Sequence, residues 1–454
     1  MENTGGRVAV IGAGASGCMA AIAAAHAGCN VILFEKNEKI AKKIYATGNG
    51  RCNLTNLFLD GSCYHTHDSG NEINRVLSFI GQFSQKDLIR FFKEAGVPVH
   101  DRGGYVYPRT DQAETVARAL EKCMRQEKVE VCTDCLVEKI EKTEEGFCIR
   151  YFLSEKDKGK AQQGRGKKQT KQTGKDGVKK TEQSCRCDAV ILCTGGMAGP
   201  SFGCSRDGYS FAEHFSHQVI RPLPALTRLE SDDPFLRRAA GVRCHASVTL
   251  LNESDEAGTD CDFEKDIFED GELQITENSI SGIPVFQISG TAAGLLSQGR
   301  NVRVRIDFLP EFTQQEYENE IEERLGQDRG QMLGDFLLGL AHRKVIDMIL
   351  ARAGLQAEMK ARRLSDRELR AILRSFRALE MEVTETGGFD HAQVTKGGIP
   401  LSEVNDSFES GKCAGLFLAG ELLDVDGRCG GYNLQWAMTS GLLAGRSAAR
   451  YLST

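Results

Sequence analysis

Short apolar runs alternate with helical patterns at the start of the chain. Residues 7–11 are apolar and rich in β-branched side chains, which is typical of a parallel strand buried on both faces. Residues 16–28 are rich in alanine and end at Gly28, so they predict a helix. Residues 30–34 repeat the first pattern and end at an acid, Glu35. This order predicts a strand, a helix and a second strand in an α/β fold.

Further helices and strands follow. Residues 71–83 and 84–96 have helical patterns, and Ser84 with Asp87 gives the second one an N-cap signal. Asp111 with Glu114 gives a similar signal for a helix that runs to about residue 127. Residues 101–109 predict a short β excursion, and residues 129–132, 136–140 and 146–152 predict strands.

A basic segment interrupts this pattern. Residues 154–186 are nearly devoid of large apolar side chains and are dense in Lys, Gln and Gly. Such a segment buries too little surface to offset the entropy of ordering, so we expect a disordered loop between two strands. A basic handle for an acidic partner is the alternative. Order returns at residues 187–196, a buried strand that ends in Thr-Gly-Gly.

The pattern changes again between residues 221 and 382. Alternating runs at residues 246–252, 272–276, 285–289 and 302–308 predict an antiparallel β unit, and residues 312–380 are helical and charged with breaks near Gly326, Gly330 and Gly354. We therefore expect residues 221–382 to form a substrate or lid domain. It is inserted into a first domain made of residues 1–220 and 383–454.

Composition narrows the class of protein. A chain of 454 residues with 41% hydrophobic and 26% charged residues fits a soluble protein of two domains. The net charge of −6 argues against broad nucleic-acid binding. No segment reaches the roughly eighteen apolar residues that a membrane helix needs. The first residues lack a basic n-region, so we expect no signal peptide and a cytoplasmic location.

The cysteines favour a structural interpretation. The chain has 16 of them, scattered along its length, which fits buried thiols in a reducing cytosol. Cys132 and Cys135 form the one C-x-x-C motif, and no second pair stands at zinc spacing. A redox or metal role for this pair is the alternative, and we predict no metal site.

The turn after the first strand carries the first chemical motif. Gly12, Gly14 and Gly17 match G-x-G-x-x-G. Gly12 makes the tight turn, Gly14 lets the backbone approach a pyrophosphate, and Gly17 lets the helix lie close to the sheet. The helix N-terminus offers N–H groups to phosphates. Glu35 stands where a carboxylate accepts hydrogen bonds from ribose hydroxyls.

Two other segments have the residue types of a ligand site. Gly48 and Gly50 permit backbone close to a ligand and Arg51 can neutralise phosphate charge, although an exposed turn explains them as well. Residues 415–437 contain an apolar strand, an acidic loop, a Gly-Gly pair and the start of a helix. Asn433 is a suitable N-cap for a helix over residues 434–451, whose N-terminus would stabilise negative charge on a ligand.

Together these motifs resemble a known family. Over nearly its whole length the chain is similar to the bacterial FAD-dependent oxidoreductases that include aminoacetone oxidase and a reductase of bile-acid 3-oxo-4,6-diene intermediates. The resemblance rests on residues 46–53, 194–196, 271–276 with 280–284, 395–398, and 420–427 with 430–433. It implies a Rossmann-like FAD-binding domain interrupted by an inserted β-barrel with helices. Many members carry a His where this chain has Glu277, so no role is carried over to that position.

The resemblance also implies how the chain holds FAD. The pyrophosphate and adenosine ribose would meet Gly12, Ala13, Gly14, Ser16, Gly17, Glu35 and Lys36, and the adenine would meet the backbone of Val137. The phosphates and flavin would be flanked by Gly48, Asn49, Gly50, Arg51, Cys52 and Asn53. The ribityl chain would meet Thr194, Gly195, Gly196, Gly420 and Glu421, and the ring would face Gly430, Gly431, Tyr432 and Asn433. In the insert, Phe286 is the candidate substrate contact, with a core role as the alternative, and no catalytic residue is assigned.

The expected activity follows from the cofactor. We expect a reductase that takes hydride from NAD(P)H and delivers it to an electron-poor C=C of a hydrophobic small molecule such as a steroid or bile acid. No second G-x-G-x-x-G is present, so NAD(P)H would dock transiently. One alternative is an oxidase of a small amino ketone such as aminoacetone. Another is a flavin-dependent RNA-modifying protein, which the basic loop favours and the net charge disfavours. We expect no nucleic-acid or membrane partner.

Overall fold

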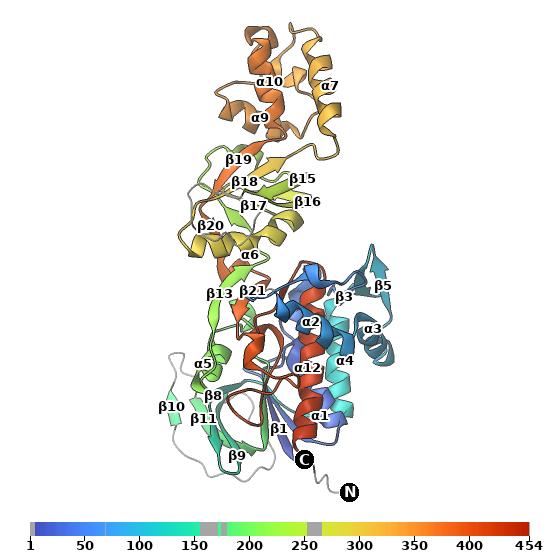
Figure 1. Ribbon diagram of the computed structural model, residues 1–454, viewed down its shortest axis with the longest axis vertical. Helices are drawn as coiled ribbons and strands as arrows, with labels where there is room; N and C mark the ends of the chain where they lie inside the picture. The colour runs from blue at the N-terminus through green and yellow to red at the C-terminus, as the bar shows by residue number, and fades with distance from the viewer. Residues whose placement is uncertain (1–4, 69, 155–170, 174–178, 252–265, 454) are drawn as a thin grey trace. The chain divides into compact units, whose positions relative to one another are not determined.

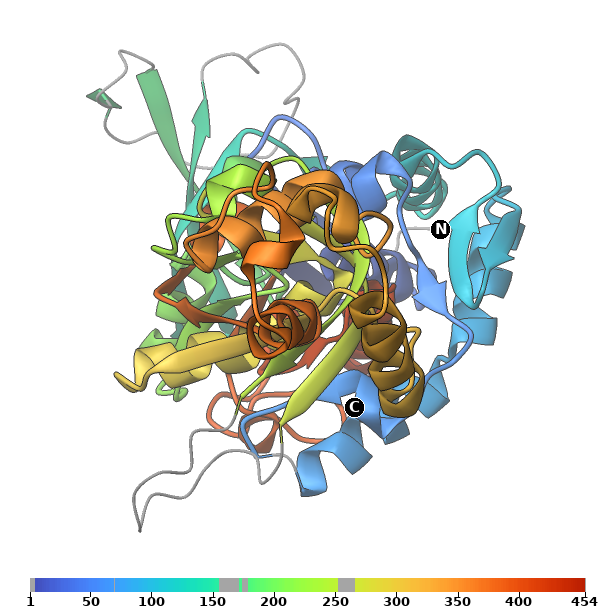
Figure 2. The same cartoon turned by 90° about the horizontal axis from the view of Figure 1, so that it is seen from above.

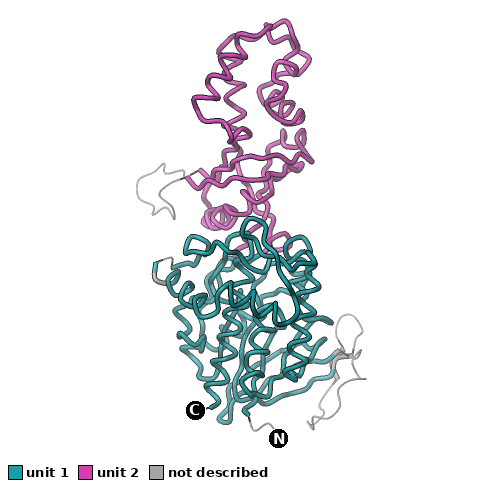
Figure 3. Tube along the Cα trace, turned by 90° about the vertical axis from the view of Figure 1, so that its right-hand side faces the viewer, with its two compact units in different colours: residues 1–222, 394–454 teal, residues 223–393 magenta. Residues whose placement is uncertain are grey.

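The chain divides into two compact units. The computed structural model describes residues 5–68, 70–154, 171–173, 179–251 and 266–453. The first unit comprises Met1–Pro222 and Val394–Thr454, and the second comprises Leu223–Gln393 (Figure 3). Residues 383–393, expected in the first domain, belong to the second unit because β20 (Glu385–Thr386) pairs with β14 (Leu229–Glu230).

A five-stranded parallel sheet forms the centre of the first unit. Its order is β22-β12-β1-β2-β7. The strands are β1 (Arg7–Ile11), β2 (Asn30–Phe34), β7 (Glu130–Cys132), β12 (Ala189–Leu192) and β22 (Leu416–Leu418). Their registers are parallel throughout, and β12 and β22 are buried along their whole length. This sheet confirms the α/β class with a Rossmann-like core.

Two helices from opposite ends of the sequence pack against each other in this unit. They are α1 (Ala15–His26) and α12 (Tyr432–Tyr451), which lie side by side (Figure 1). A Cβ added at Gly441 would lie 2.1 Å from the carbonyl oxygen of Ser16, and one at Gly445 would lie 2.3 Å from that of Ala20. Only glycine allows this approach, so the returning segment is locked to the first helix of the chain.

Smaller elements surround the sheet. The helices are α2 (Asn71–Gln82), α3 (Gln85–Glu94), α4 (Ala113–Gln126) and α5 (Asp207–His214). The short strands of this unit are β3 (Thr55–Asn56), β4 (Tyr64–His65), β5 (Val99–Arg102), β6 (Tyr105–Pro108), β21 (Val394–Gly398) and β23 (Asp426–Gly427). The chain passes from the first unit to the second within β13 (Ile220–Ala225). The β5–β6 hairpin lies beside α3 (Figure 2).

The helix caps predicted at Ser84 and Asp111 have different outcomes. Ser84 caps α3 and forms the expected capping box with Asp87. The prediction at Asp111 is wrong, because α4 has Gln112 as its N-cap and no side-chain cap. The Asp111 carboxylate instead pairs with His100 at 3.0 Å and with Arg102.

The basic segment is partly ordered. A four-stranded antiparallel sheet has the order β10-β11-β9-β8, with β8 (Cys135–Thr143), β9 (Gly146–Ser154), β10 (Lys171–Thr173) and β11 (Lys179–Cys187). Disorder across residues 154–186 is therefore wrong for residues 154, 171–173 and 179–186, since residues 180–187 of β11 pair with β9, β10 pairs with β11, and Cys185 is buried. The rest of this prediction falls on residues 155–170 and 174–178, which lie outside the described residues.

The second unit is built on an antiparallel sheet of seven strands in the order β19-β18-β15-β16-β17-β14-β20. The additional strands are β15 (Arg243–Leu250), β16 (Ile267–Ile275), β17 (Ser279–Gly282), β18 (Val302–Asp307) and β19 (Leu379–Val383). Thr384 alone separates β19 from β20, the two strands at the ends of this order. Within this unit α6 (Ile283–Ser297) packs on the sheet, while α7 (Gln314–Leu325), α9 (Arg343–Arg352) and α10 (Asp366–Ser375) lie together (Figure 1). Two short helices complete it, α8 (Leu333–Phe336) and α11 (Gly388–His391).

One predicted strand in this unit is a helix. Residues 285–289 were expected as a β run, and they form the first half of α6. Pro284 stands in the first turn of the helix, where its missing N–H costs nothing. The helix buries mainly one face, but the polar Ser289 lies on that face and the apolar Ile283 is exposed, so the apolar residues alone do not show the helical period.

Candidate functional site

The motif residues meet at the carboxyl edge of the parallel sheet. The strands β22, β12, β1 and β2 are neighbours and parallel, so their carboxyl ends lie along one edge. Residues 420–421 follow β22, residues 194–196 follow β12, residues 12–17 follow β1, and residues 35–36 follow β2. The carboxyl edge of an open α/β sheet is where ligands bind in such folds.

The turn between β1 and α1 contains three glycines with different roles. Backbone conformation or packing explains two of them, and neither explains the third. A Cβ at Gly17 would lie 1.8 Å from the Gly12 carbonyl oxygen, so Gly17 is required by the close approach of helix and turn. Gly12 has a φ of +96°. Gly14 has an ordinary φ of −75°, and an added Cβ would meet no atom within 4 Å. Neither strain nor packing explains glycine at position 14, which fits a ligand close to its backbone.

Glu35 is held against this turn. Its carboxylate accepts hydrogen bonds from the Ala13 N–H at 2.9 Å, the Asn37 N–H at 2.8 Å and the Asn37 side-chain amide at 2.6 Å. The side chain is 8% exposed. The neighbouring Lys36 ammonium pairs with Asp207 at 2.8 Å and donates to Ser205 at 2.7 Å. The acid is thus fixed beside the glycine turn.

The loop after residue 43 has an unusual backbone. Gly48, Asn49, Gly50 and Cys52 all have positive φ angles, so this loop curls in the left-handed region. Arg51 is exposed, while Cys52 is buried and burial raises the pKa of its thiol to about 12. Asn53 Oδ1 is buried and has no hydrogen-bond partner among the described residues. An orphaned acceptor in this loop fits a ligand with a donor group.

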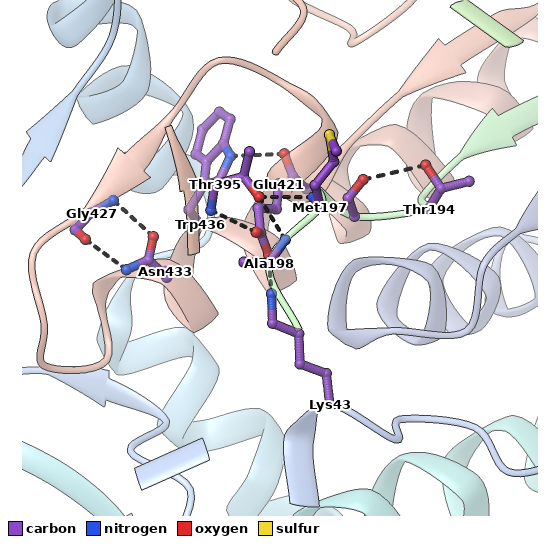
Figure 4. Close-up of polar contacts among 11 residues, drawn as sticks. Lys43, Thr194, Met197, Ala198, Thr395, Glu421, Gly427, Asn433 and Trp436 are labelled. Carbon is purple, nitrogen blue, oxygen red and sulfur yellow. Dashed lines mark hydrogen bonds and ion pairs between the residues drawn. The ribbon is translucent and has the colours of Figure 1, made fainter. Parts of the chain in front are cut away.

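A charged network joins this loop to the returning segment (Figure 4). The carboxylate of Glu421 pairs with the Lys43 ammonium at 2.8 Å and accepts from the Thr395 N–H at 2.9 Å. The Thr395 hydroxyl in turn accepts from the Met197 N–H at 2.8 Å and the Ala198 N–H at 3.0 Å. Burial alone would lower the pKa of Lys43, but the Glu421 carboxylate outweighs it and the pKa is raised. Lys43 and Thr395 were not predicted as site residues, although Thr395 begins one of the motifs quoted above.

The loop before α12 is clamped by Asn433. Gly427 N–H donates to Asn433 Oδ1 at 2.8 Å, and Asn433 Nδ2 donates to the Gly427 carbonyl at 2.7 Å (Figure 4). The prediction that Asn433 caps the helix is wrong, because α12 begins at Tyr432 and its N-cap is Gly431, with no side-chain cap. The N–H groups of its first turn therefore stay available. Tyr432 donates its hydroxyl to the Phe58 carbonyl at 2.9 Å.

Two acids of the same segment are buried. Asp424 is 1% exposed and accepts from the His67 N–H at 2.8 Å, and burial raises its pKa to about 6. Asp426 pairs with His65 at 3.4 Å. Unlike Glu421, Asp424 has no ammonium or guanidinium ion-paired to it within the described chain.

Of the remaining predicted site residues, Gly195 and Gly196 lie at this edge, whereas Val137 and Phe286 do not follow its strands. Gly195 has a φ of +73° and open space where a Cβ would point, whereas a Cβ at Gly196 would lie 2.4 Å from the Thr395 hydroxyl. Val137 lies on β8 next to a bulge. Phe286 lies half-buried on α6 of the second unit. Among the described residues no group of three or more His, Cys, Asp or Glu is arranged to hold a metal ion.

The donor set at the edge fits a dinucleotide. The first turns of α1 and α12 contain no acid and no side-chain cap, so their N–H groups are available to anionic oxygens. Gly14 leaves room for a pyrophosphate, and Glu35 presents a carboxylate beside it. Over the part of the chain that the structure describes, no helix is long and apolar enough to cross a bilayer.

Comparison with known proteins gives one family match. Residues 6–163 and 160–447 match the family described as HI0933-like protein Rossmann domain.

Three curated relatives align along nearly the whole chain. A 3-dehydro-bile acid Δ(4,6)-reductase from Clostridium scindens is 38% identical, covering 98% of this chain and 99% of the relative. A ribosomal RNA dihydrouridine synthase from Haemophilus influenzae is 27% identical, covering 97% and 98%. A protein of the same name from Escherichia coli K12 is 26% identical, covering 95% of each chain.

Proposed function

Because the chain belongs to the HI0933-like Rossmann family and is an FAD-dependent oxidoreductase, we propose that it saturates an electron-poor C=C bond in a hydrophobic, steroid-like small molecule. The observation that carries this proposal is the 38% identity to a 3-dehydro-bile acid Δ(4,6)-reductase over 98% of the chain. A C=C bond conjugated to a carbonyl accepts hydride at the carbon farther from the carbonyl, because the resulting negative charge spreads to the carbonyl oxygen.

FAD, when bound, supplies the hydride chemistry, and the chain supplies binding and orientation. In this proposal the turn at residues 12–14 and the first turn of α1 bind the pyrophosphate, and Glu35 binds the adenosine ribose. The first turn of α12 would present its N–H groups to the flavin ring and stabilise negative charge there. The Glu421, Lys43 and Thr395 network fixes the loop that carries residues 194–198.

The reductant in this proposal is NAD(P)H, docked transiently. The experiment is anaerobic rapid mixing of the FAD-loaded protein, first with NADH or NADPH and then with a 3-oxo-Δ4,6 steroid. We expect the flavin absorbance near 450 nm to bleach with the nicotinamide and to recover with the steroid. Recovery only when oxygen is admitted would contradict the reductase and favour an oxidase of an amino ketone.

A second candidate is the reduction of uridine in RNA. Two relatives at 27% and 26% identity are named ribosomal RNA dihydrouridine synthases. Formation of dihydrouridine also saturates a ring C=C next to a carbonyl, so the same site chemistry would serve both substrates. The higher identity to the bile-acid reductase favours the small molecule.

A comparison of the two substrates, each tested separately, decides between the two candidate functions. The anaerobically reduced protein is mixed with either the steroid or unmodified ribosomal RNA, and re-oxidation of the flavin is followed. We expect fast recovery with the steroid and none with RNA. Recovery with RNA alone, together with dihydrouridine detected by mass spectrometry of the digest, would replace the first candidate by the second.

A further inference from the structure

The C-x-x-C pair lies against the segment that carries Glu35. β7 ends at Cys132 and β8 begins at Cys135. The Glu35 N–H donates to the Cys132 carbonyl at 2.8 Å, and the Cys135 N–H donates to the Glu35 carbonyl at 2.9 Å. Asp134, between the two cysteines, donates its N–H to the Asn37 carbonyl at 2.9 Å. The turn between the cysteines therefore holds the backbone of residues 35–37.

The two thiols differ in access. Cys132 is half-buried, whereas Cys135 is 1% exposed. The side chains are within hydrogen-bonding reach of each other, and this contact together with burial raises the pKa of the Cys135 thiol. A reagent in solution therefore reaches Cys132 before Cys135, and the two thiols are in contact. This is the arrangement of an attacking and a resolving thiol.

We propose that Cys132 and Cys135 form a reversible disulfide that weakens FAD binding at Glu35. The Cys132 thiolate attacks an external disulfide such as oxidised glutathione, forms a mixed disulfide and releases one glutathione thiolate. Cys135 loses its proton to water, attacks the Cys132 sulfur and releases the second glutathione. The two protein thiols lose two electrons and two protons, which the two glutathione molecules gain.

Coupling to the cofactor follows from the shared backbone. The Glu35 carboxylate bonds the Ala13 N–H in the glycine turn, and the Glu35 N–H and carbonyl bond the two cysteines. Closing the bond draws the end of β7 toward the start of β8 and shifts residues 35–37, so the carboxylate moves from the turn. The effect of the disulfide on FAD binding, unlike its formation, rests on the proposed function.

Thermodynamic linkage between disulfide formation and FAD binding gives a second measurement of their coupling. A typical coupling between two sites is about fivefold or more, and it is reciprocal. If the disulfide raises the Kd for FAD about fivefold, saturating FAD must favour the dithiol by the same factor. For a two-electron couple that factor raises the midpoint potential of the pair by about 20 mV.

The experiment uses the full chain in glutathione buffers of graded redox poise. Peptide mapping by mass spectrometry follows the bond, and quenching of FAD fluorescence gives the Kd in each state. We expect a peptide cross-linked between Cys132 and Cys135 that dithiothreitol reverses, a Kd raised about fivefold in the oxidised protein, and the matching shift of midpoint potential with FAD. Cys132→Ser and Cys135→Ser should each remove the redox dependence while binding FAD as the reduced protein does. Cys123→Ser, at a half-buried cysteine on α4, is the matched control and should change nothing.

Each outcome has a meaning. Absence of the cross-link, a cross-link to another cysteine such as Cys185, or a cross-link with unchanged Kd overturns the proposal. Failure of the reduced wild-type protein to bind FAD overturns the proposed function instead, and the mapping still reports whether the pair closes.

Discussion

The turn after β1 and the segment between β22 and α12 lie at the same edge of the sheet, yet they are held in different ways. In the first, the backbone itself gives the shape, since Gly17 lets the helix lie against the Gly12 carbonyl. In the second, side chains hold the backbone: Asn433 clamps Gly427, and the Trp436 ring N–H donates to the Gly420 carbonyl at 3.1 Å. A turn shaped by backbone contact is sensitive to any added atom, whereas a turn held by side chains is sensitive to lost hydrogen bonds.

The largest expected effect is that of Gly17→Val. The new Cβ would lie 1.8 Å from the Gly12 carbonyl oxygen, so helix and turn must separate. We expect a loss of about 3 kcal/mol or more in unfolding free energy and little folded protein. Yield of monodisperse protein and chemical denaturation measure it. Near-normal stability would show that the turn is not set by this contact.

Gly14→Val should leave the fold and remove the cofactor. An added Cβ there meets no atom of the protein within 4 Å. We expect a Tm close to that of the flavin-free wild-type protein and FAD binding weakened about a hundredfold or more, which corresponds to about 3 kcal/mol. The Kd comes from fluorescence titration, with Gly14→Ala as an intermediate. A variant that copurifies with a full complement of FAD would mean that this turn does not meet the pyrophosphate.

Asp424→Asn tests the second segment through pH. The folded-state pKa is raised from 3.8 to about 6, so the folded protein binds this proton more tightly than the unfolded chain. The wild-type protein therefore loses unfolding free energy as pH rises between these values, because the buried Asp424 carboxyl ionises. The full loss remains above pH 6. The neutral variant has no buried carboxylate to ionise, so we expect it to be more stable than the wild-type protein by about 2–3 kcal/mol at pH 7–8. Denaturation curves from pH 4 to 8 should show the advantage fading toward acid, and parallel curves would contradict the assignment.

Asn433→Ala should have the smallest effect. It removes both hydrogen bonds to Gly427, for which we expect a loss of about 1–2 kcal/mol and a modest rise in the Kd for FAD. Asn405→Ala is the matched control, since the side-chain Oδ1 of Asn405 also holds a loop, by accepting from the Ser407 and Glu409 N–H groups. If both variants lose similar stability and only Asn433→Ala changes the Kd for FAD, the hydrogen bonds between Asn433 and Gly427 support FAD binding. A change of Kd in both would remove that assignment.

Predictions from the sequence succeed where the cause is local. The capping box of Ser84 and Asp87 lies within one helical turn, and the sequence patterns of β1, α1 and β2 each lie within a dozen residues. The glycine spacing predicts a bent backbone because the residue type itself permits the conformation. In each case the determinant and the structure it produces occupy the same short stretch of chain.

Predictions fail where a partner outside the helix or strand itself decides. The Glu421 carboxylate finds Lys43, which lies in another segment, and no spacing in the sequence links the two. Asp111 and Asn433 are good caps by type, but His100 and Gly427 offer their side chains better bonds than the helix ends do. The strand β11 looks too polar to be ordered, and it is ordered because β9 supplies its backbone partners.

The close contact between α1 and α12 sets the order in which the chain can mature on the ribosome. The core of the first unit needs α12, which is synthesised only after the whole of Leu223–Gln393 has emerged. The inserted unit is contiguous in sequence and has its own apolar core, so it is the first to possess all of its contacts. We therefore expect a released chain truncated near residue 393 to protect the insert from protease while the N-terminal half remains cleavable, the reverse of the usual N-terminal-first order.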